Sequence, residues 1–519
     1  MANKSLFRSI LGKLVPSFDS VNEAGGAAYA RSPRQALAQY AATGCLNMTF
    51  YATAEEQLDT VMKLSGEIDA EFLAKTAVYC RERGHMKDMP ALLCAILSKK
   101  DGALLKRIFS RVIDNGKMLR NFVQILRSGV TGRKSLGSLP KKLVQNWFDR
   151  TPDDIFKSSV GQSPSMGDIL KMTHPKPVSP AHEALFAYLI DKPVKEENLP
   201  ELITKFEAFK KKRTSEVPAV PFQLLTALDL QTEDWKGIAR NIGWHGLRMN
   251  LNTFQRHDVF SDPEMIDYIA KRLSDETEIS KARVFPYQLL SAFINTEKVP
   301  LQIREALQDA MEISINNVPR IDGDLVLCPD VSGSMRSPVT GYRAGATTKV
   351  RCIDVAGLLS AAFLRRNKTA RVIPFEQKVV DLVLNGRDTV MTNAEKLAKI
   401  GGGGTSCSAP LSLLNSQKAR ADMVIYVSDN ESWADSKGRF GGRGTAMMEQ
   451  WSIFKARNPK AKLVCIDITP SATIQTVDRD DILNVGGFSD SVFELIQLFS
   501  TGKMHPEHWA GVVDAVSLN

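Results

Sequence analysis

Apolar residues recur every three to four positions from about residue 30 to residue 315, a spacing that predicts helices throughout this part of the chain. In the segment 104–112 they stand at positions 104, 105, 108, 109 and 112, and the segment 72–80 repeats such a face. Asp88 lies two residues before Pro90, which predicts a capped helix start with proline in the first turn. Because no alternating strand pattern appears before residue 320, we expect this region to be all-helical.

A short repeated word lies within the helical region. Pro221-Phe-Gln-Leu-Leu-Thr-Ala227 returns 65 residues later as Pro286-Tyr-Gln-Leu-Leu-Ser-Ala292. Each copy is predicted to begin a helix with its proline and to bury its two leucines. Repeating helical hairpins of this length indicate a HEAT-like α-solenoid, in which each hairpin packs only on its neighbours. The alternative is that two unrelated amphipathic helices share the same word.

The pattern changes after residue 320, where short apolar strands alternate with helices. The predicted strands are 325–328, 372–374, 423–427 and 463–466, and the predicted helices lie near 352–366, 391–399, 409–417 and 445–457. This alternation predicts an α/β, Rossmann-like domain with a mostly parallel sheet. The predicted organisation is therefore a multidomain chain: an N-terminal extension (1–20), a helical-repeat domain (21–320) and an α/β domain (321–519).

Five oxygen-bearing side chains are predicted to meet in the α/β domain. Asp330 and Asp429 each follow a predicted strand, and ligands of such sheets gather at the carboxyl ends of strands. Ser332 and Ser334 follow Asp330 at alternating positions, and Thr405 ends a run of four glycines. Carboxylates and hydroxyls are ligands for a small hard cation, and room left for water favours Mg²⁺. The alternative is a capping turn without a metal.

The composition is that of an ordinary globular protein with a modest basic excess. The formal net charge is +9, from 67 Lys and Arg against 58 Asp and Glu. The first 320 residues hold 44 cations against 37 carboxylates and so carry +7, which favours a polyanionic partner for the helical region. No apolar run is long enough for a membrane span, and the basic start has no signal core. Seven dispersed cysteines without a C-x-x-C pair indicate reduced thiols in a cytoplasmic protein.

Cations gather around a glycine-rich loop in the helical region. The segment 127–142 carries five of them, namely Arg127, Arg133, Lys134, Lys141 and Lys142. Lys, Arg, backbone N–H groups and Ser hydroxyls at a helix start all bind phosphates. Further candidates for phosphate contact are Lys157, His174 and Lys176, whereas the run 210–213 is more typical of a solvated face. The segment Trp244–Asn250 either stacks on unpaired bases or places Trp244 in the core.

The strand-terminal Asp-x-Ser-x-Ser, the Thr405 turn and Asp429 together resemble the metal-ion-dependent adhesion site of von Willebrand factor A domains. That resemblance assigns Ser332, Ser334 and Thr405 as direct ligands, with Asp330 and Asp429 binding directly or through water. A helical module joined to such a domain resembles the Ro autoantigen (TROVE) family, in particular its bacterial orthologues. The segments that carry the resemblance are 22–26, 79–90, 128–142 and 330–335.

The resemblance implies a definite function. Ro proteins close their helical repeats into a ring, bind small noncoding Y RNAs on a basic outer surface, and admit single-stranded 3′ ends of misfolded RNAs into a central hole. Some bacterial members tether an exoribonuclease through the Y RNA. Carried over by motif, the first candidates for phosphate contact are Arg133, Lys134, Lys141 and Lys142. The residues Lys157, His174 and Lys176 follow in a looser assignment. A ring made from one chain implies a monomer.

An enzymatic function is not expected. The position that would be the general acid in a D-x-D phosphatase is Ser332, which cannot serve as one. The chain also lacks a G-x-x-x-x-G-K-[ST] phosphate loop and a His-x-x-x-His zinc pair. We therefore expect a non-catalytic RNA-binding protein for RNA quality control. The alternative is a metal-dependent module that captures a partner's carboxylate without RNA.

Overall fold

The computed structural model describes residues 15–44, 46–212, 214, 216–282, 284, 286–345, 347–435, 444–504 and 508–519. Most of the predicted N-terminal extension, together with Cys45 and Arg213, lies outside these residues. The chain forms two compact units. The α/β unit contains residues up to 72, 285–294 and 311–516, and the helical unit contains 73–284, 295–310 and 517–519.

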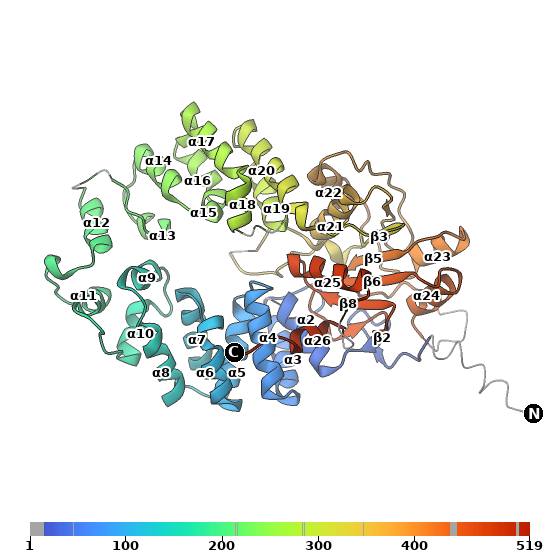
Figure 1. The fold of residues 1–519 in the computed structure, drawn as a ribbon, viewed down its shortest axis with the longest axis horizontal. Helices are drawn as coiled ribbons and strands as arrows, with labels where there is room; N and C mark the ends of the chain where they lie inside the picture. The colour runs from blue at the N-terminus through green and yellow to red at the C-terminus, as the bar shows by residue number, and fades with distance from the viewer. Residues whose placement is uncertain are drawn as a thin grey trace, which may run out of the picture. The chain divides into compact units, whose positions relative to one another are not determined.

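The helical unit is a succession of short helices, which follow one another along the ribbon in Figure 1. Its helices are α5 (Asp88–Lys100), α6 (Gly102–Val112), α7 (Gly116–Arg127), α8 (Ser138–Trp147), α9 (Pro152–Lys157), α10 (Met166–Thr173), α11 (Pro180–Leu189), α12 (Glu201–Lys210), α13 (Phe222–Leu225), α14 (Thr232–Asn241), α15 (Trp244–Met249), α16 (Leu251–Arg256), α17 (Pro263–Leu273) and α18 (Glu276–Ala282), together with most of α4 (Ala70–Glu82) and of α20 (Leu301–Ser314). Helix α5 packs on α6 and α7, and α10 packs on α7, α8 and α11. The predicted helical region is confirmed here.

Local capping chemistry explains where several of these helices begin. The side chain of Asp101 accepts a hydrogen bond from Leu104 N at the start of α6, and Asn115 accepts one from Met118 N at the start of α7. The predicted helix start with Pro90 in its first turn is confirmed, but the cap at Asp88 is wrong, because α5 begins at Asp88 itself and Lys87 provides no side-chain cap. Asp88 accepts instead from Asn121 Nδ2 (2.8 Å), so its carboxylate ties α5 to α7.

The two copies of the repeated word differ in length as helices. The first forms α13, a single turn of four residues, whereas the second forms α19 (Pro286–Asn295), which has ten. In α19 both leucines of the word are buried, but in α13 only Leu225 is. The word starts a helix both times, and the packing around it decides how far the helix extends.

The α/β unit is built on a five-stranded parallel sheet of order β4-β3-β5-β6-β8. The strands are β3 (Leu325–Pro329), β4 (Arg371–Val372), β5 (Met423–Ser428), β6 (Lys462–Asp467) and β8 (Ile482–Gly486). The first four were predicted, although β4 is shorter than expected, and β8 was missed. The predicted helices are confirmed as α21 (Cys352–Arg366), α22 (Val390–Ala398), α23 (Ala409–Ser416) and α24 (Ala446–Arg457).

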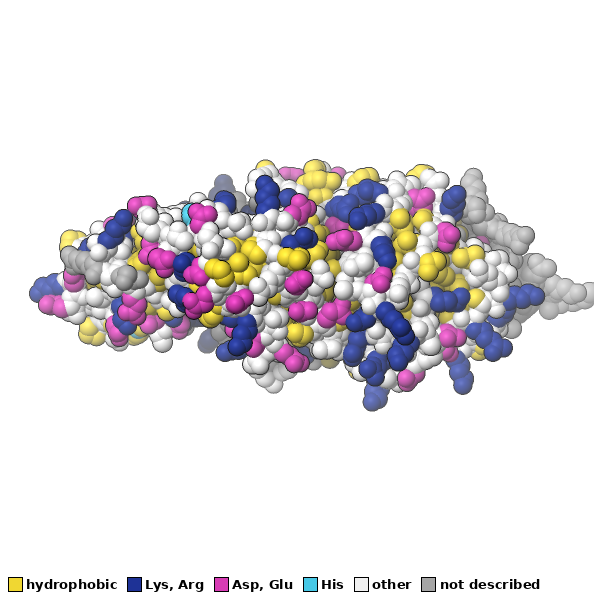
Figure 2. Space-filling view, turned by 90° about the horizontal axis from the view of Figure 1, so that it is seen from above, with side chains coloured by type: hydrophobic (Ala, Val, Ile, Leu, Met, Phe, Trp, Pro, Cys, Tyr) yellow, Lys and Arg dark blue, Asp and Glu magenta, His cyan; other side chains and the backbone are white. Residues whose placement is uncertain are grey.

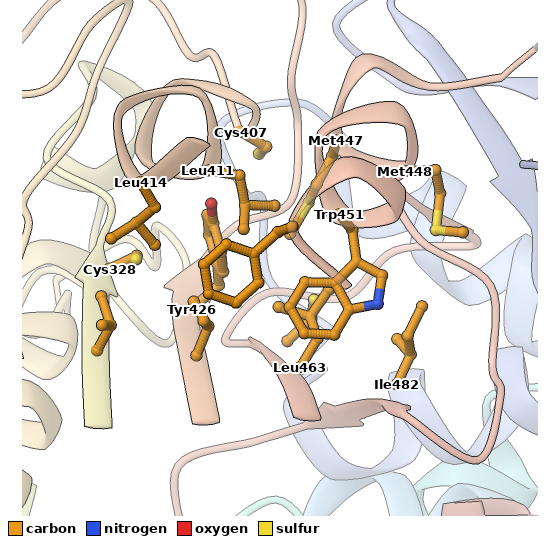
Figure 3. Close-up of a cluster of buried hydrophobic side chains, with 14 of the residues drawn as sticks. Cys328, Cys407, Leu411, Leu414, Tyr426, Met447, Met448, Trp451, Leu463 and Ile482 are labelled. Atoms are coloured by element: carbon orange, nitrogen blue, oxygen red, sulfur yellow. The ribbon is translucent and has the colours of Figure 1, made fainter. Parts of the chain in front are cut away.

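Helices cover the sheet and enclose an apolar core. One buried cluster joins α23 and α24 to the strands, with Trp451 and Phe454 of α24 stacked at 5.6 Å between ring centroids. Figure 3 shows Trp451 beside Leu463 of β6 and Ile482 of β8, in a cluster that also contains Tyr426 of β5 and Cys328 of β3. Helix α21 packs on β3 and β5, and β8 is contacted by α25 (Asp490–Ser500), α26 (His508–Asp514) and α2 (Pro33–Thr43). All six described free cysteines are buried, as expected for reduced thiols.

The expectation of no strand before residue 320 is wrong. Strands β1 (Ser20–Val21) and β2 (Ala27–Ala30) form an antiparallel sheet with β7 (Thr473–Ile474). These strands are two to four residues long, too short to show an alternating pattern, and β2 pairs with a strand more than 400 residues away in sequence. With α2 and α3 (Ala54–Glu67), they place the N-terminal segment within the α/β unit.

The secondary structure changes character at the predicted boundary near residue 320, whereas the compact units divide the chain at other positions. None of the described helices is both long and apolar enough to cross a membrane.

Candidate functional site

The two strand-terminal carboxylates meet at one edge of the parallel sheet. Strands β3 and β5 are neighbours, with Pro329 opposite Val427, so the residues that follow them emerge side by side. Asp330 continues the ladder by donating its N–H to Val427 O (2.9 Å), and Asp429 follows the last residue of β5. The predicted convergence of Asp330 and Asp429 is therefore present in the fold.

Three hydroxyls are held at the same edge. Ser332 Oγ lies 3.3 Å from Ser334 Oγ, just beyond Asp330. The glycine turn that carries Thr405 is bonded to this loop through Gly402 N to Val331 O (2.9 Å) and Gly333 N to Gly403 O (2.8 Å). The structure thus gathers the five predicted side chains, which we call the oxygen cluster: Asp330, Ser332, Ser334, Thr405 and Asp429.

Both carboxylates of the oxygen cluster are buried without a cationic partner. Asp330 is 0% and Asp429 is 2% exposed, and among the described residues neither forms an ion pair with Lys, Arg or His. Burial, and then the charge of Asp429, raise the pKa of Asp330, and burial raises the pKa of Asp429. Two buried, adjacent carboxylates repel one another, and a divalent cation between them would remove that repulsion.

The donor set fits a hard cation. Its oxygens come from two carboxylates and three hydroxyls, and in the described part of the chain no group of three His, Cys, Asp or Glu side chains could hold a metal by itself. Asp330 also accepts hydrogen bonds from Ser332 N (2.8 Å) and Ser428 Oγ (2.6 Å), which fix its orientation. A capping turn without a metal would also make the hydrogen bond from Ser332 N to Asp330. The observation that favours a cation is therefore the burial of two carboxylates that have no cationic partner among the described residues.

Aromatic side chains flank the open side of the oxygen cluster. Phe50, Tyr51 and Trp433 line one cleft together with Ser334 and Thr405. The Phe50 and Tyr51 rings make an edge contact at 4.8 Å between centroids. Phe50 is 57% and Trp433 is 53% exposed, which is unusual for rings of this size. The cleft is therefore open to solvent and has an apolar rim.

Sequence reasoning missed the residues that support the oxygen cluster. Ser428, the last residue of β5, bonds Asp330 as described above. The Asp435 carboxylate accepts hydrogen bonds from the hydroxyls of Ser406 (2.6 Å), Ser408 (2.7 Å) and Ser432 (2.6 Å), and so fixes the turn after Thr405. A serine ending an apolar strand and an aspartate in a loop carry no local signal, because their role exists only once the two loops lie together.

The predicted basic loop joins α7 to α8. Gly129, Gly132 and Gly137 have φ values of +87°, +77° and +75°, a region that L side chains rarely adopt, so the glycines permit its path. The loop is anchored by Leu136, which is buried. The five predicted cations stand around it, with Arg127 at the end of α7 and Lys141 and Lys142 in the first turns of α8.

These cations form no ion pairs with carboxylates of the described residues, although the charge of Arg127 contributes to lowering the pKa of Asp168. Of the five, Lys134 and Lys142 are exposed. Lys99, on α5, was missed: a Cβ on Gly132 would lie 3.0 Å from its Nζ, and Lys99 also is unpaired in the described chain. We call this set of six the basic patch: Lys99, Arg127, Arg133, Lys134, Lys141 and Lys142.

The run predicted to be a solvated face differs from the basic patch. Lys210 and Lys211 pair with Glu207, at 3.2 and 3.9 Å, and Lys212 pairs with Asp229 at 3.2 Å. These charges are already neutralised by neighbours. On the face of the molecule shown in Figure 2, Lys and Arg are interspersed with Asp and Glu, so affinity for a polyanion depends on local groups of unpaired cations.

The looser candidates lie in two places. His174, which has a left-handed φ of +51°, follows α10, and Gln145 of α8 donates to its carbonyl (3.4 Å) and to that of Thr173 (2.7 Å). Lys176 follows two residues later and is exposed. Lys157 is the last residue of α9. The carbonyl of the next residue, Ser158, packs against Gly116 at the start of α7, whereas Arg127 is at the other end of that helix.

Trp244 is a core residue. It is 4% exposed, and its Nε1 donates to Arg272 O (3.1 Å). Arg248 is buried, and the His245 ring bonds to Ala282 O (2.7 Å). Of the two interpretations of this segment, the structure selects the core, because the indole is not available for stacking on a base.

Comparisons with known proteins agree with this architecture. Residues 325–500 match the family model described as the Ro60 vWA domain. The chain is 24% identical to the RNA-binding protein RO60 of Deinococcus radiodurans, over 93% of this chain and 95% of that protein. It is 23% identical to the RNA-binding protein RO60 of Caenorhabditis elegans, over 47% of this chain and 38% of that one.

The fold is also shared with a solved structure. The crystal structure of the Deinococcus radiodurans RO (RSR) protein superposes with a TM-score of 0.62 and 21% identity, covering 91% of this chain and 100% of the other. A helical-repeat region and a parallel-sheet domain with strand-terminal Asp330 and Asp429 occur here in one chain. Together with the two relatives, these features make the chain similar in sequence and architecture to the Ro proteins named above.

Proposed function

We propose that this protein binds RNA without catalysing a reaction on it, and that its basic patch contacts the phosphates of a small folded Y-like RNA. The observation that carries the proposal is the set of six cations around one glycine-rich loop that form no ion pair with any described residue, whereas the lysines at 210–212 are paired with carboxylates. Lys and Arg side chains without an ion pair gain the most binding free energy from contact with phosphate, because they give up no existing ion pair. The names of the two relatives support the same function.

The test is a gel-shift titration with a structured small RNA that co-purifies with the protein. We expect Arg133→Glu with Lys134→Glu to weaken binding roughly a hundredfold, because two phosphate contacts become repulsions. The matched control is Lys210→Glu with Lys211→Glu, which changes the net charge by the same amount at a neutralised site. Equal losses in the two double variants would mean that only net charge matters, and would contradict the basic patch.

The Ro resemblance extends this proposal to RNA quality control. In that role the protein also binds single-stranded 3′ ends of misfolded RNAs in the central hole of a closed ring, acts as a cytoplasmic monomer, and associates with an exoribonuclease through the bound small RNA. Sequencing of co-purified RNA tests this part. Recovery of one abundant folded RNA together with 3′-extended transcripts supports it, and recovery of neither contradicts it.

We propose, further, that the oxygen cluster holds Mg²⁺. Ser332, Ser334 and Thr405 would be direct ligands, with Asp330 and Asp429 binding directly or through water. When bound, the ion supplies positive charge and an open coordination position. Buried, unpaired carboxylates and hard oxygen donors support the proposal. Calorimetric titration with MgCl₂ tests it, and the absence of saturable binding would contradict it.

A second candidate function uses the same cluster to capture a carboxylate of a partner protein without RNA. The exposed Phe50 and Trp433 rings beside the cluster favour it, because apolar rims are typical of protein interfaces. The two functions differ in their response to salt and to a metal chelator. RNA binding weakens steeply with salt, whereas metal-bridged capture is abolished by EDTA.

A further inference from the structure

The N-terminal hairpin reaches the loop that carries Asp429. Asn22, between β1 and β2, is 5% exposed and donates from Nδ2 to Ser432 O (2.8 Å). Its Oδ1 accepts from Gly26 N (2.6 Å), so the same side chain closes the hairpin and holds the loop. A second contact runs from Ala24 N to Glu431 Oε2 (3.2 Å). The loop that carries Asp429 is therefore hydrogen-bonded to a segment about 400 residues earlier in sequence.

Gly26 permits this approach. A Cβ at this position would lie 1.9 Å from Ser432 O and 3.0 Å from Ser432 C, both of which are backbone atoms. The backbone of Gly26 has an ordinary negative φ, so the glycine is needed for the contact rather than for its conformation. Any larger residue must push the hairpin and the loop apart.

Ser432 connects the two loops of the oxygen cluster. Its Oγ accepts from Cys407 N (3.0 Å), two residues after Thr405, and donates to Asp435 Oδ2 (2.6 Å). The next residue, Trp433, donates its N–H to Thr405 O (3.1 Å). Because Asp429 is three residues before Ser432, a displacement of Ser432 moves both Asp429 and Thr405.

We propose that Asn22 and Gly26 are positioning residues of the metal site: the N-terminal hairpin sets the separation of Asp429 and Thr405 by holding Ser432. This inference rests on the proposed Mg²⁺ site. It makes the N-terminal segment a structural part of a site whose ligands all lie beyond residue 329. Residues that orient the ligands of a metal, without touching it, typically change its affinity ten- to a hundredfold.

The experiment measures the Mg²⁺ affinity of the full chain by calorimetry, beside its melting temperature without metal and its RNA affinity. We expect Gly26→Ala and Asn22→Ala to weaken Mg²⁺ binding by roughly ten- to a hundredfold, with RNA affinity unchanged. The matched control is Gly66→Ala in α3, where an added Cβ meets no atom within 4 Å. Its Mg²⁺ affinity should equal that of the unmodified protein.

Each other outcome is decisive. If the unmodified protein binds Mg²⁺ and both hairpin variants bind it equally well, the positioning role is wrong while the metal site stands. If the unmodified protein does not bind Mg²⁺, the metal site fails and the inference fails with it. If Gly26→Ala does not fold, Asn22→Ala decides, because it removes two hydrogen bonds without introducing a clash. A drop in its metal-free melting temperature with no change in Mg²⁺ affinity would indicate a purely structural hairpin.

Discussion

The oxygen cluster and the basic patch hold their charged side chains in opposite ways, the first buried and the second exposed. In the oxygen cluster, Asp330 and Asp429 are almost fully buried and hydrogen bonds fix the surrounding loops. In the basic patch, Lys134 and Lys142 are exposed and the loop path depends on glycines. A buried site derives its selectivity from fixed geometry, whereas an exposed one derives its affinity from the number of unpaired charges. The two should therefore respond to different perturbations.

The largest expected effect is the loss of metal binding without loss of RNA binding. Asp330→Ala removes a buried carboxylate at the centre of the oxygen cluster. We expect Mg²⁺ affinity to fall by more than about a hundredfold, since a lost ligand costs more than a lost supporting residue. RNA affinity should change by less than about twofold, because the basic patch lies in the other compact unit. Calorimetry and gel shifts on one preparation measure both, and a large RNA defect in the folded variant would show that the sites are coupled.

The second expected effect is a strong pH dependence of the affinity for Mg²⁺, but not of the affinity for RNA. Burial raises the pKa of Asp330 and the pKa of Asp429 in the metal-free protein, and the charge of Asp429 raises that of Asp330 further, so protons compete with Mg²⁺ as the pH falls. Affinity for Mg²⁺ should drop by roughly tenfold per pH unit for each proton that binding must release. Calorimetry at several pH values between about 8 and about 6 would show it. An affinity that is flat across this range would mean that the carboxylates are already ionised without metal.

The raised pKa values of the two carboxylates also predict whether the stability of the protein rises or falls with pH. A carboxylate whose pKa is raised on folding binds more protons when folded, so metal-free stability falls as pH rises from its unfolded to its folded pKa. We expect saturating Mg²⁺ to reverse or flatten this slope, because the ion replaces the protons. Denaturant unfolding with and without Mg²⁺ measures it, and equal slopes in the two conditions would contradict metal binding at the carboxylates.

A smaller effect is expected at Ser428. Its hydroxyl donates to Asp330 Oδ2 at 2.6 Å and accepts from Asn430 N at 2.9 Å, so it supports Asp330 and the turn that carries Asp429 without being a predicted ligand. Ser428→Ala should weaken Mg²⁺ binding by about tenfold, the lower end for a supporting residue. Ser428→Thr keeps the hydroxyl and should restore most of the affinity. If both variants bind Mg²⁺ as tightly as the original, Asp330 does not need this bond.

The smallest expected effect is a change in the salt dependence of RNA binding. Lys99→Gln removes one unpaired cation beside Gly132 and leaves the loop glycines in place. The slope of log affinity against log salt should become shallower by about one, with a severalfold loss of affinity at low salt. Lys212→Gln, at a neutralised lysine, is the control. An unchanged slope for Lys99→Gln would remove it from the basic patch.

Local patterns in the sequence predicted the helices of the first part, four of the five parallel strands, the five side chains of the oxygen cluster and five of the six cations of the basic patch. The apolar period of segment 104–112 corresponds to α6, and the strand endings at Asp330 and Asp429 led directly to the oxygen cluster. Such features are readable because each depends on neighbours within a few residues. The five cations of segment 127–142 were readable for the same reason.

Only the tertiary structure decided which distant residues meet. The sequence did not reveal that Asn22 bonds Ser432, that Asp435 fixes the turn after Thr405, or that Lys99 joins the basic patch. It left Trp244 open between stacking and core, and the packing around Arg272 placed it in the core. These contacts join elements that no local period connects, and burial in the folded protein, rather than residue type, determines what each side chain can do.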